Sequence, residues 1–300
     1  MMILDCPFKE KENTDEKGVY GMSATGREKY DLPGYEKWLR EQERSEVTIR
    51  KYLQSARCFL KALDSTELTK ERTLAYKELL ISGRYRVRSV NSMIAALNSF
   101  LRYLGREGCR LRAIRCQHEA YCDASRELSR EEYLRLLEAA RKKPRLYLLL
   151  QTIGGTGIRI SELKYFTVET VHRGEIEVTG KGKRRKILLP SKLRKVLLQY
   201  AQKAGIVSGI IFRTKTGHPL DRSNVWSEMK ALCAKAQVEP SKVYPHNLRK
   251  LFARSFYRQS KDLSKLADVL GHSNIETTRI YIITSGWEHM RELEKMKLVI

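Results

Sequence analysis

Two short motifs in the second half of the chain carry charged side chains at spacings that could hold an anion. Arg159 follows the glycine-rich stretch 154–157 and is predicted at the start of a helix, with Glu162 one turn on and able to orient it. His246 and Arg249 are i,i+3 neighbours on one face of a predicted helix. Guanidinium forks bind phosphate oxygens and imidazoles move protons, so these residue types suit chemistry on an anionic substrate.

Three further residues follow the same order along the chain. Lys181 lies in a Gly-Lys-Gly turn, His272 in a Leu-Gly-His-Ser motif that ends a helix, and Tyr281 nine residues after His272. Taken singly, each has an ordinary interpretation: a solvated basic turn, a helix end and a core tyrosine. No Gly-Lys-Ser/Thr follows the glycines near Arg159 at the distance that a P-loop requires, which excludes that nucleotide-binding motif.

The elements that must position these residues are mostly helices. Ser129 and Glu132 form a capping-box pattern at the start of the second unit, and residues 175–190 are typical of a β-hairpin with a glycine-bearing basic turn. Apolar periodicity predicts the helices that follow over residues 191–203, 222–237, 246–259, 262–270, 274–283 and 287–297, the last with an apolar stripe of Trp287, Met290, Leu293 and Met296.

A smaller helical unit precedes this one. Residues 1–30 are polar and charged and are predicted to be a flexible arm. Helices are predicted near 34–43, 45–63, 69–82 and 87–104, which makes a small all-α domain over residues 31–107. Residues 108–127 have little periodicity and are predicted to be a linker to a second domain over 128–300.

The charge balance indicates a polyanionic partner. The 300 residues carry 58 Lys and Arg against 35 Asp and Glu, a net charge of +23 with a pI near 9.8. Residues 1–30 hold five basic and six acidic side chains, so the excess lies on the folded body. This balance favours nucleic acid over an acidic membrane surface.

The remaining composition favours a cytoplasmic protein without a metal. No apolar run is long enough to span a membrane, and the N-terminus lacks the pattern of a secretory signal. The six cysteines are then most simply free thiols, with Cys58 and Cys233 in the core. The cluster of Cys109, Cys116, His118 and Cys122 has no usual zinc spacing, so we expect no metal.

In this order the motifs resemble those of the tyrosine recombinase family, which includes phage integrases and Xer-type recombinases. That family has an arginine, a lysine, a His-x-x-Arg, a histidine or tryptophan and then a tyrosine. The resemblance covers residues 129–285 strongly, whereas 33–104 fits the family's core-binding, SAM-like domain in size and position only. It implies a mainly α fold with a small β-hairpin or sheet in the catalytic domain, arranged as a two-domain DNA clamp.

The resemblance also assigns roles. It makes Tyr281 the nucleophile that forms a 3′-phosphotyrosyl bond, His246 the base or proton relay for it, and Lys181 the acid that protonates the departing 5′ oxygen. The turn is crowded with basic residues, so the choice of Lys181 over Lys183 depends on Gly-Lys-Gly alone. The phosphate would be held by Arg159, Arg249 and His272, with Glu162 in support, and DNA by Arg86, Arg88, Asn91 and Lys183.

Family behaviour further implies the cofactors and partners. Transfer of the phosphate to tyrosine conserves bond energy, so the predicted reaction needs neither metal nor ATP and no other cofactor. The implied DNA partner is a double-stranded core site with inverted repeats, on which four protomers exchange strands through a Holliday junction. An accessory directionality protein is a further implied partner, and helix 287–297 would dock either on its own body or on a neighbour.

Three functions remain open from the sequence. The first is a site-specific recombinase that acts in integration or excision, inversion or resolution. The second is a DNA-binding regulator that keeps the fold without recombining, against which the intact residue set argues. The third is a type IB topoisomerase, which shares the tyrosine chemistry and needs no synapsis.

Overall fold

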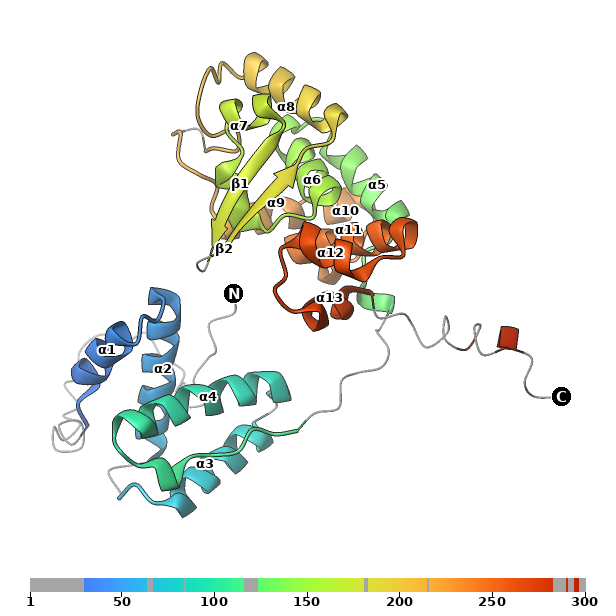
Figure 1. Cartoon of the computed structure of the whole chain (residues 1–300). Coiled ribbons are helices and arrows are strands. Elements are labelled where there is room, and N and C mark those ends of the chain that lie inside the picture. The colour runs from blue at the N-terminus through green and yellow to red at the C-terminus, as the bar shows by residue number, and fades with distance from the viewer. Residues whose placement is uncertain are drawn as a thin grey trace, which may run out of the picture. The chain divides into compact units, whose positions relative to one another are not determined.

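The computed structural model describes residues 30–63, 67–83, 85–115, 124–180, 183–214, 216–282, 290 and 294–296. The chain divides into two compact units, residues 1–118 and 119–300 (Figure 1). The predicted arm at 1–30 lies outside the described residues except for Tyr30, and so does most of the predicted helix 287–297. No helix in the described parts of the chain has the length and apolar character to cross a bilayer.

The described part of the first unit is built from four α-helices. Asp31 caps the first helix by accepting a hydrogen bond from the Gly34 amide at 2.7 Å, and Thr69 caps the third. Aromatic and aliphatic side chains from all four helices form its core, with Tyr35, Phe59 and Phe100 among the most buried. The helices are α1 (Leu32–Glu41), α2 (Glu46–Leu63), α3 (Lys70–Ser82) and α4 (Val87–Tyr103), followed by the short η2 (Glu107–Cys109).

The chain beyond α4 folds back onto this unit, although the sequence places a linker there from residue 108. The side chain of Leu111 is buried in the core of the unit, and Ile114 packs against that core. The amide of Asn98 accepts from the Leu111 N–H and donates to its carbonyl oxygen, both at 2.8 Å. Residues up to 115 therefore belong to the first unit, because two apolar side chains and paired backbone groups hold them there.

The second unit is mainly helical with one small sheet, which confirms the predicted fold class. The capping box at Ser129 and Glu132 starts its first α-helix. The predicted helix 222–237 is two helices, with a break at residues 231–232. The elements are η3 (Ala124–Arg126), α5 (Arg130–Ala140), α6 (Pro144–Thr156), η4 (Ile160–Tyr165), α7 (Val168–Arg173), β1 (Glu175–Gly180), β2 (Lys183–Leu188), α8 (Ser191–Lys203), α9 (Arg222–Lys230), α10 (Cys233–Ala236), η5 (Pro240–Lys242), α11 (Pro245–Ser260), α12 (Leu263–Leu270) and α13 (Ile275–Ile282).

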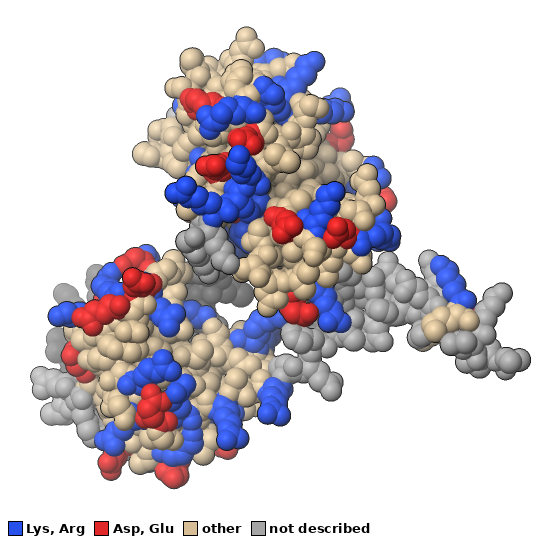
Figure 2. All heavy atoms as spheres, in the orientation of Figure 1, with Lys and Arg blue, Asp and Glu red and all other residues tan. Residues whose placement is uncertain are grey.

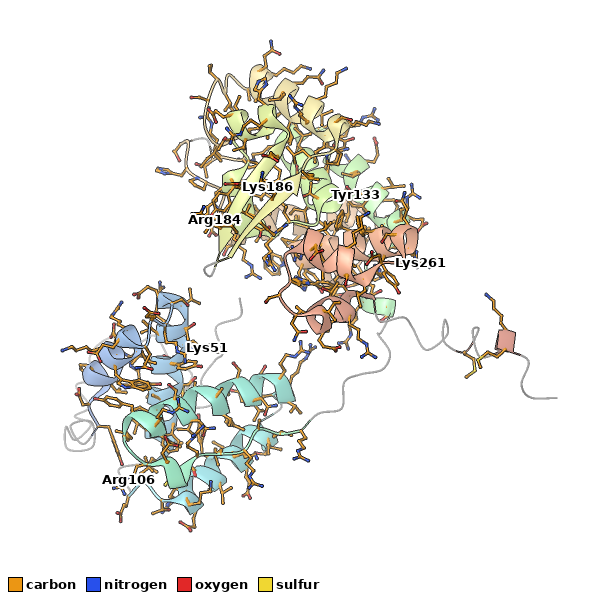
Figure 3. All side chains as sticks on the ribbon, in the orientation of Figure 1. Lys51, Arg106, Tyr133, Arg184, Lys186 and Lys261 are labelled. Carbon is orange, nitrogen blue, oxygen red and sulfur yellow. The ribbon has the colours of Figure 1, made fainter. Side chains whose placement is uncertain are left out.

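The sheet is an antiparallel hairpin whose two faces differ. Ile176 pairs with Ile187 and Val178 pairs with Arg185, and the three aliphatic side chains are buried in the core of the unit. The alternate residues Arg184 and Lys186 are exposed on β2 (Figure 3). Strand alternation therefore places Arg185 on the same face as the core residues.

Two left-handed glycines end the helices that lead to the polar motifs. Gly157 caps α6 with φ +64°, and Gly271 caps α12 with φ +65°. The turn before Arg159 contains fewer residues than the sequence predicts, because Gly154 and Gly155 belong to α6. Gly154 is needed there for packing, since a Cβ at this position would lie 2.7 Å from the hydroxyl of Tyr133.

Three helices, α11 to α13, form a small subcluster. The helices α11, α12 and α13 pack on one another, and α11 also packs along α6 (Figure 1). Their shared apolar core contains Ala253, Leu266, Leu270 and Tyr281, with Phe252, Phe256 and Tyr257 partly buried around it. This packing brings the His-x-x-Arg, Leu-Gly-His-Ser and tyrosine motifs together.

Candidate active site

Arg249 lies at the centre of the polar cluster and is 1% exposed. Its Nη1 donates to the Gly157 carbonyl oxygen at 2.6 Å, and its Nη2 donates to the Leu270 carbonyl oxygen at 2.8 Å. Its Nε is buried without a partner among the described residues. Burial, followed by the positive charge of Arg159, lowers the pKa of Arg249 to about 10, so it stays charged at neutral pH.

His272 is held between Arg249 and Thr278. Its Nε2 lies 2.9 Å from Nη2 of Arg249, and its Nδ1 lies 2.8 Å from the hydroxyl of Thr278. Burial, followed by the charges of Arg249 and Arg159, lowers the pKa of His272 to about 4. The imidazole is therefore neutral at physiological pH.

Tyr281 is 6% exposed and lies between two imidazoles. The centre of its ring is 5.3 Å from that of His246 and 5.4 Å from that of His272. A hydrogen bond between Tyr281 and Arg249 favours the charged form of the arginine. A tyrosine on α13 is thus placed beside residues from α11 and from the turn after α12.

His246 stands at the first turn of α11, where its surface remains exposed although the surrounding protein desolvates the ring. That desolvation is the first cause of a pKa lowered to about 4, and the nearby positive charges of Lys250, Arg249, Arg159 and Arg222 act in the same direction. His246 is a neutral base with an open side, surrounded by cations.

Arg159 is fixed by Glu162 while its outer side stays open. Glu162 accepts from the Arg159 backbone N–H at 2.7 Å with Oε2 and from its Nη1 at 3.2 Å with Oε1. The side chain of Arg159 is 44% exposed, whereas that of Glu162 is 11% exposed. The carboxylate orients the guanidinium as the i,i+3 spacing predicts, although the element is the 3-10 helix η4 and not an α-helix.

Arg185 is a member of the cluster that sequence reasoning missed. Its Nη2 donates to Oε2 of Glu162 at 2.6 Å, and its Nη1 donates to the Val269 carbonyl oxygen at 2.8 Å. The sequence presents it as one of four consecutive basic residues, 183–186, so it has no distinguishing motif. Arg185 is two residues before the buried Ile187 on β2, so strand alternation places both side chains on the same face. That spacing is the signal that could have identified it.

The remaining predicted site residues are not all brought to this cluster. Lys181 lies outside the described residues, and Lys183 is placed only by register, paired with Gly180. Arg86 and Arg88 are exposed at the start of α4, where Arg86 is the N-cap residue. Basic side chains also gather over the hairpin, where Arg184 and Lys186 are exposed (Figure 2).

The structure gives Asn91 a role within the first unit, while its predicted DNA contact stays a prediction. Its Oδ1 accepts from the Ile114 N–H at 2.7 Å, and its Nδ2 donates to the Ile114 carbonyl oxygen at 2.9 Å. The amide is thus used to hold the chain that follows α4. Its position beside the basic segment 84–89 suggested DNA, and the paired backbone groups account for the amide.

Among the described residues, no three His, Cys, Asp or Glu side chains meet in a group that could hold a metal ion. Of the cysteine and histidine cluster considered in the sequence, only Cys109 is described, as a half-buried free thiol. Cys58 and Cys233 are buried in the cores of their units, and neither belongs to a disulfide bond among the described residues. The absence of a metal requirement stays a prediction.

Comparison with known families decides the identity. Residues 126–285, more than half of the chain, match the family described as the Phage integrase family. The chain belongs to the phage integrase family. Residues 32–108 match the integrase N-terminal SAM-like domain, so both units of this integrase-family chain have counterparts.

Relatives and solved structures agree with this assignment. The tyrosine recombinase XerA of Thermococcus kodakarensis is 32% identical over 278 residues, which cover 88% of this chain and 94% of that protein. A lambda integrase tetramer bound to a Holliday junction matches with a TM-score of 0.68 at 19% identity, covering 91% of this chain and 84% of that one. XerH bound to palindromic difH substrate in a post-cleavage complex matches with a TM-score of 0.67 at 19% identity, covering 89% and 84%.

These comparisons confirm the predicted tyrosine recombinase family and its enzymatic function as a site-specific DNA recombinase. They give no support to a type IB topoisomerase or to a catalytically silent regulator. The structure adds that five residues of the recombinase motif, which are far apart in the sequence, lie in one cluster: Arg159, His246, Arg249, His272 and Tyr281.

Proposed function

We propose that this recombinase cuts one DNA strand at a time by attack of the Tyr281 hydroxyl on a phosphodiester. The oxygen–phosphorus bond to Tyr281 forms as the bond to the 5′ oxygen breaks, which leaves a 3′-phosphotyrosyl link and a free 5′-hydroxyl. The observation that carries this proposal is the placement of the buried Tyr281 ring between His246 and His272, beside the buried Arg249.

The proton movements follow from the neighbours of Tyr281. A phenol has an ordinary pKa near 10 and must lose its proton during attack. His246 accepts that proton, since it is neutral at physiological pH and its ring lies 5.3 Å from the Tyr281 ring. Lys181 is proposed to protonate the departing 5′ oxygen, a role that comes from its Gly-Lys-Gly motif alone.

The phosphate is proposed to sit against Arg159, Arg249 and His272. Arg159 has an open side chain that can donate to a non-bridging oxygen, and the buried Arg249 adds positive charge beside it. Positive groups that are fixed before the reaction stabilise the charge that grows on the phosphate in the transition state. These groups supply the charge that a metal would give, so we propose a metal- and ATP-independent reaction.

The wider assembly is proposed from the relatives. The two units would clamp duplex DNA at inverted-repeat core sites in the cytoplasm, at the nucleoid. Four protomers would exchange strands through a Holliday junction, as the lambda integrase tetramer bound to such a junction suggests. A helix over 287–297 would dock in cis or in trans, and an accessory protein would set direction.

A covalent-trapping assay tests the proposal. Wild type and Tyr281→Phe are incubated in EDTA with labelled duplexes from the DNA that flanks the gene, nicked near candidate inverted repeats. We expect a protease-sensitive, retarded band on a denaturing gel with wild type and none with Tyr281→Phe. Tyr257→Phe, which changes a half-buried tyrosine on α11, is the matched control and should keep the band.

Two results would overturn the proposal. An adduct of equal yield with Tyr281→Phe would assign the nucleophile to another residue, and a band that requires added divalent metal would remove the metal-independent mechanism. Strand exchange between two sites, scored on plasmids, separates recombination from simple relaxation of supercoils.

A further inference from the structure

An arginine occupies the core-facing side of the hairpin. Arg185 pairs across the sheet with Val178, and their neighbours on the same face are Ile176 and Ile187, all three aliphatic residues being buried. The side chain of Arg185 is 13% exposed. Taking a guanidinium out of water is unfavourable unless its N–H groups are paired, so this position needs an explanation.

The contacts of Arg185 join three separate elements. From β2 it donates to the carboxylate of Glu162 in η4 and to the carbonyl oxygen of Val269 near the end of α12. Glu162 Oε2 also accepts from the Arg159 backbone at 2.7 Å. One side chain therefore connects the hairpin to the segment that carries Arg159 and to the helix end that precedes His272.

The turn after α12 is shaped around the same side chain. A Cβ at Gly271 would lie 2.1 Å from Cδ of Arg185. Two features therefore favour glycine at position 271: its φ of +65° and the methylene groups of Arg185, which lie where a Cβ would be. His272 follows directly, so its backbone position depends on where Arg185 lies.

Arg185 also changes how strongly Glu162 neutralises Arg159. Without Arg185, the carboxylate would have a single guanidinium partner and would cancel its charge more completely. With two arginines on one carboxylate, Arg159 keeps a larger share of its attraction for phosphate. Burial lowers the pKa of Arg185 while Glu162 opposes that shift, which fits a cation kept in place by its carboxylate partner.

We propose that Arg185 is a positioning residue for the recombination reaction. It holds Glu162, and through it Arg159, and it fixes the turn that presents His272, so that both residues meet the scissile phosphate. The inference rests on the proposed function, because it needs Arg159 and His272 to contact that phosphate.

The first test measures single-turnover formation of the covalent adduct and DNA affinity separately. We expect Arg185→Gln to slow adduct formation on the order of 10- to 100-fold, the range typical of residues that orient a catalytic group, with little change in Kd. Arg185→Lys should recover only part of the rate, because an ammonium lacks the fork that reaches two acceptors. Arg184→Gln removes an exposed charge from the same strand and should react at the wild-type rate.

A modified substrate separates positioning from general stability. A methylphosphonate at the scissile position replaces one charged non-bridging oxygen with a methyl group and so depends less on the arginines. The deficit of Arg185→Gln should shrink on this substrate, as should that of Arg159→Ala. A deficit of unchanged size on both substrates would overturn the inference.

A double-mutant cycle keeps the test valid if Arg185→Gln folds poorly. Glu162→Gln combined with Arg185→Gln removes both members of the buried ion pair, so no uncompensated carboxylate is left. If Arg185 acts through Glu162, its replacement should cost far less rate in this background than in wild type. An equal loss of rate in the wild-type and Glu162→Gln backgrounds, or a wild-type rate for Arg185→Gln, would refute this inference and leave the proposed function standing. Failure of wild type to form any adduct would overturn the proposed function and this inference with it.

Discussion

The Nδ1 atom of His272 lies 2.8 Å from the hydroxyl oxygen of Thr278, a residue that is fully buried. Because the guanidinium of Arg249 can only donate, Nε2 of His272 must accept from it, and the ring proton is then on Nδ1. Thr278 therefore accepts from His272 in this arrangement. When Nε2 instead donates to a phosphate oxygen, the same hydroxyl can turn and donate to Nδ1, so Thr278 serves both tautomers.

Thr278→Val should slow adduct formation by several-fold to about tenfold, the effect of losing one hydrogen bond of ordinary strength. Valine keeps the shape and removes the hydroxyl, whereas Thr278→Ser keeps the hydroxyl and should restore most of the rate. Thr277→Val, at the exposed neighbouring position, is the control. Equal rates for the Val and Ser variants would show that packing, and not the hydrogen bond, sets the role of Thr278.

The free energy of unfolding should fall as the pH is lowered from 7 to about 4. The pKa of His272 is about 4 in the folded protein and near 6.5 when unfolded, so the unfolded state binds more protons across that interval. The stabilisation is present above pH 6.5 and is lost on the way down to pH 4. Urea unfolding at pH 7 and pH 5 measures the difference, which should be smaller in His272→Gln.

Two neighbouring glycines should respond oppositely to alanine. Gly157→Ala should destabilise the protein by about 2 kcal/mol or more, because its φ is +64° and a Cβ would lie 2.3 Å from the Phe252 ring. Gly155 is exposed inside α6 with nothing near a Cβ, so Gly155→Ala should stabilise it by about 0.5–1 kcal/mol. Urea unfolding of both variants would test this, and equal shifts would contradict the structure.

The Asn98 amide should protect the chain that follows α4. Asn98→Ala removes the acceptor of the Leu111 N–H, so hydrogen exchange at Leu111 should speed up while that at Ile114, held by Asn91, changes less. Asn91→Ala should produce the reverse pattern. Exchange measured by mass spectrometry on short peptides, or by NMR, would distinguish the two. Slow exchange at both positions in both variants would mean that apolar packing alone holds the segment.

Arg86 and Arg88 should contact phosphates through charge alone. Both are exposed, and neither makes an ion pair with another residue in the described part of the chain. Replacing both with alanine should weaken binding to all sequences and reduce the slope of log K against log salt by about 0.9 per lost contact. Arg40→Ala is the comparison, because Arg40 is already paired with Glu36 and Glu46. An unchanged slope in the double variant would refute the role.

The sequence predicted the site residues that belong to a recognisable motif better than the residues that hold those motif residues in place. Arg159, His246 and Tyr281 belong to motifs that follow a recognisable order, and the structure brings them together. Thr278 and Arg185 were missed because their partners lie across a turn or on another element. Only the three-dimensional path of α12 and β2 reveals those contacts.

Polar residues near the surface of the first unit were harder to interpret. Asn91 lies beside arginines, which suggested DNA, yet its amide pairs with the backbone of Ile114. The residues around Asn91 give no indication that its partner is Ile114, 23 positions further along the chain. The apolar pair Leu111 and Ile114 was a signal that this stretch packs, but without helical periodicity it resembled a linker.

The carbonyl partners of Arg249 have a consequence for the energy of the whole catalytic unit. Gly157 and Leu270 stand at the C-terminal ends of α6 and α12, so in the described part of the chain the negative poles of two helix dipoles hold the buried cation. Among the described residues, Glu162 is the one acid paired with these arginines, so the cluster of Arg159, Arg185 and Arg249 keeps a surplus of positive charge there. Mutual repulsion of these groups opposes folding until an anion arrives. The phosphate on which the enzyme acts is therefore also a counter-ion for this cluster. Binding of the substrate phosphate should stabilise the folded catalytic unit.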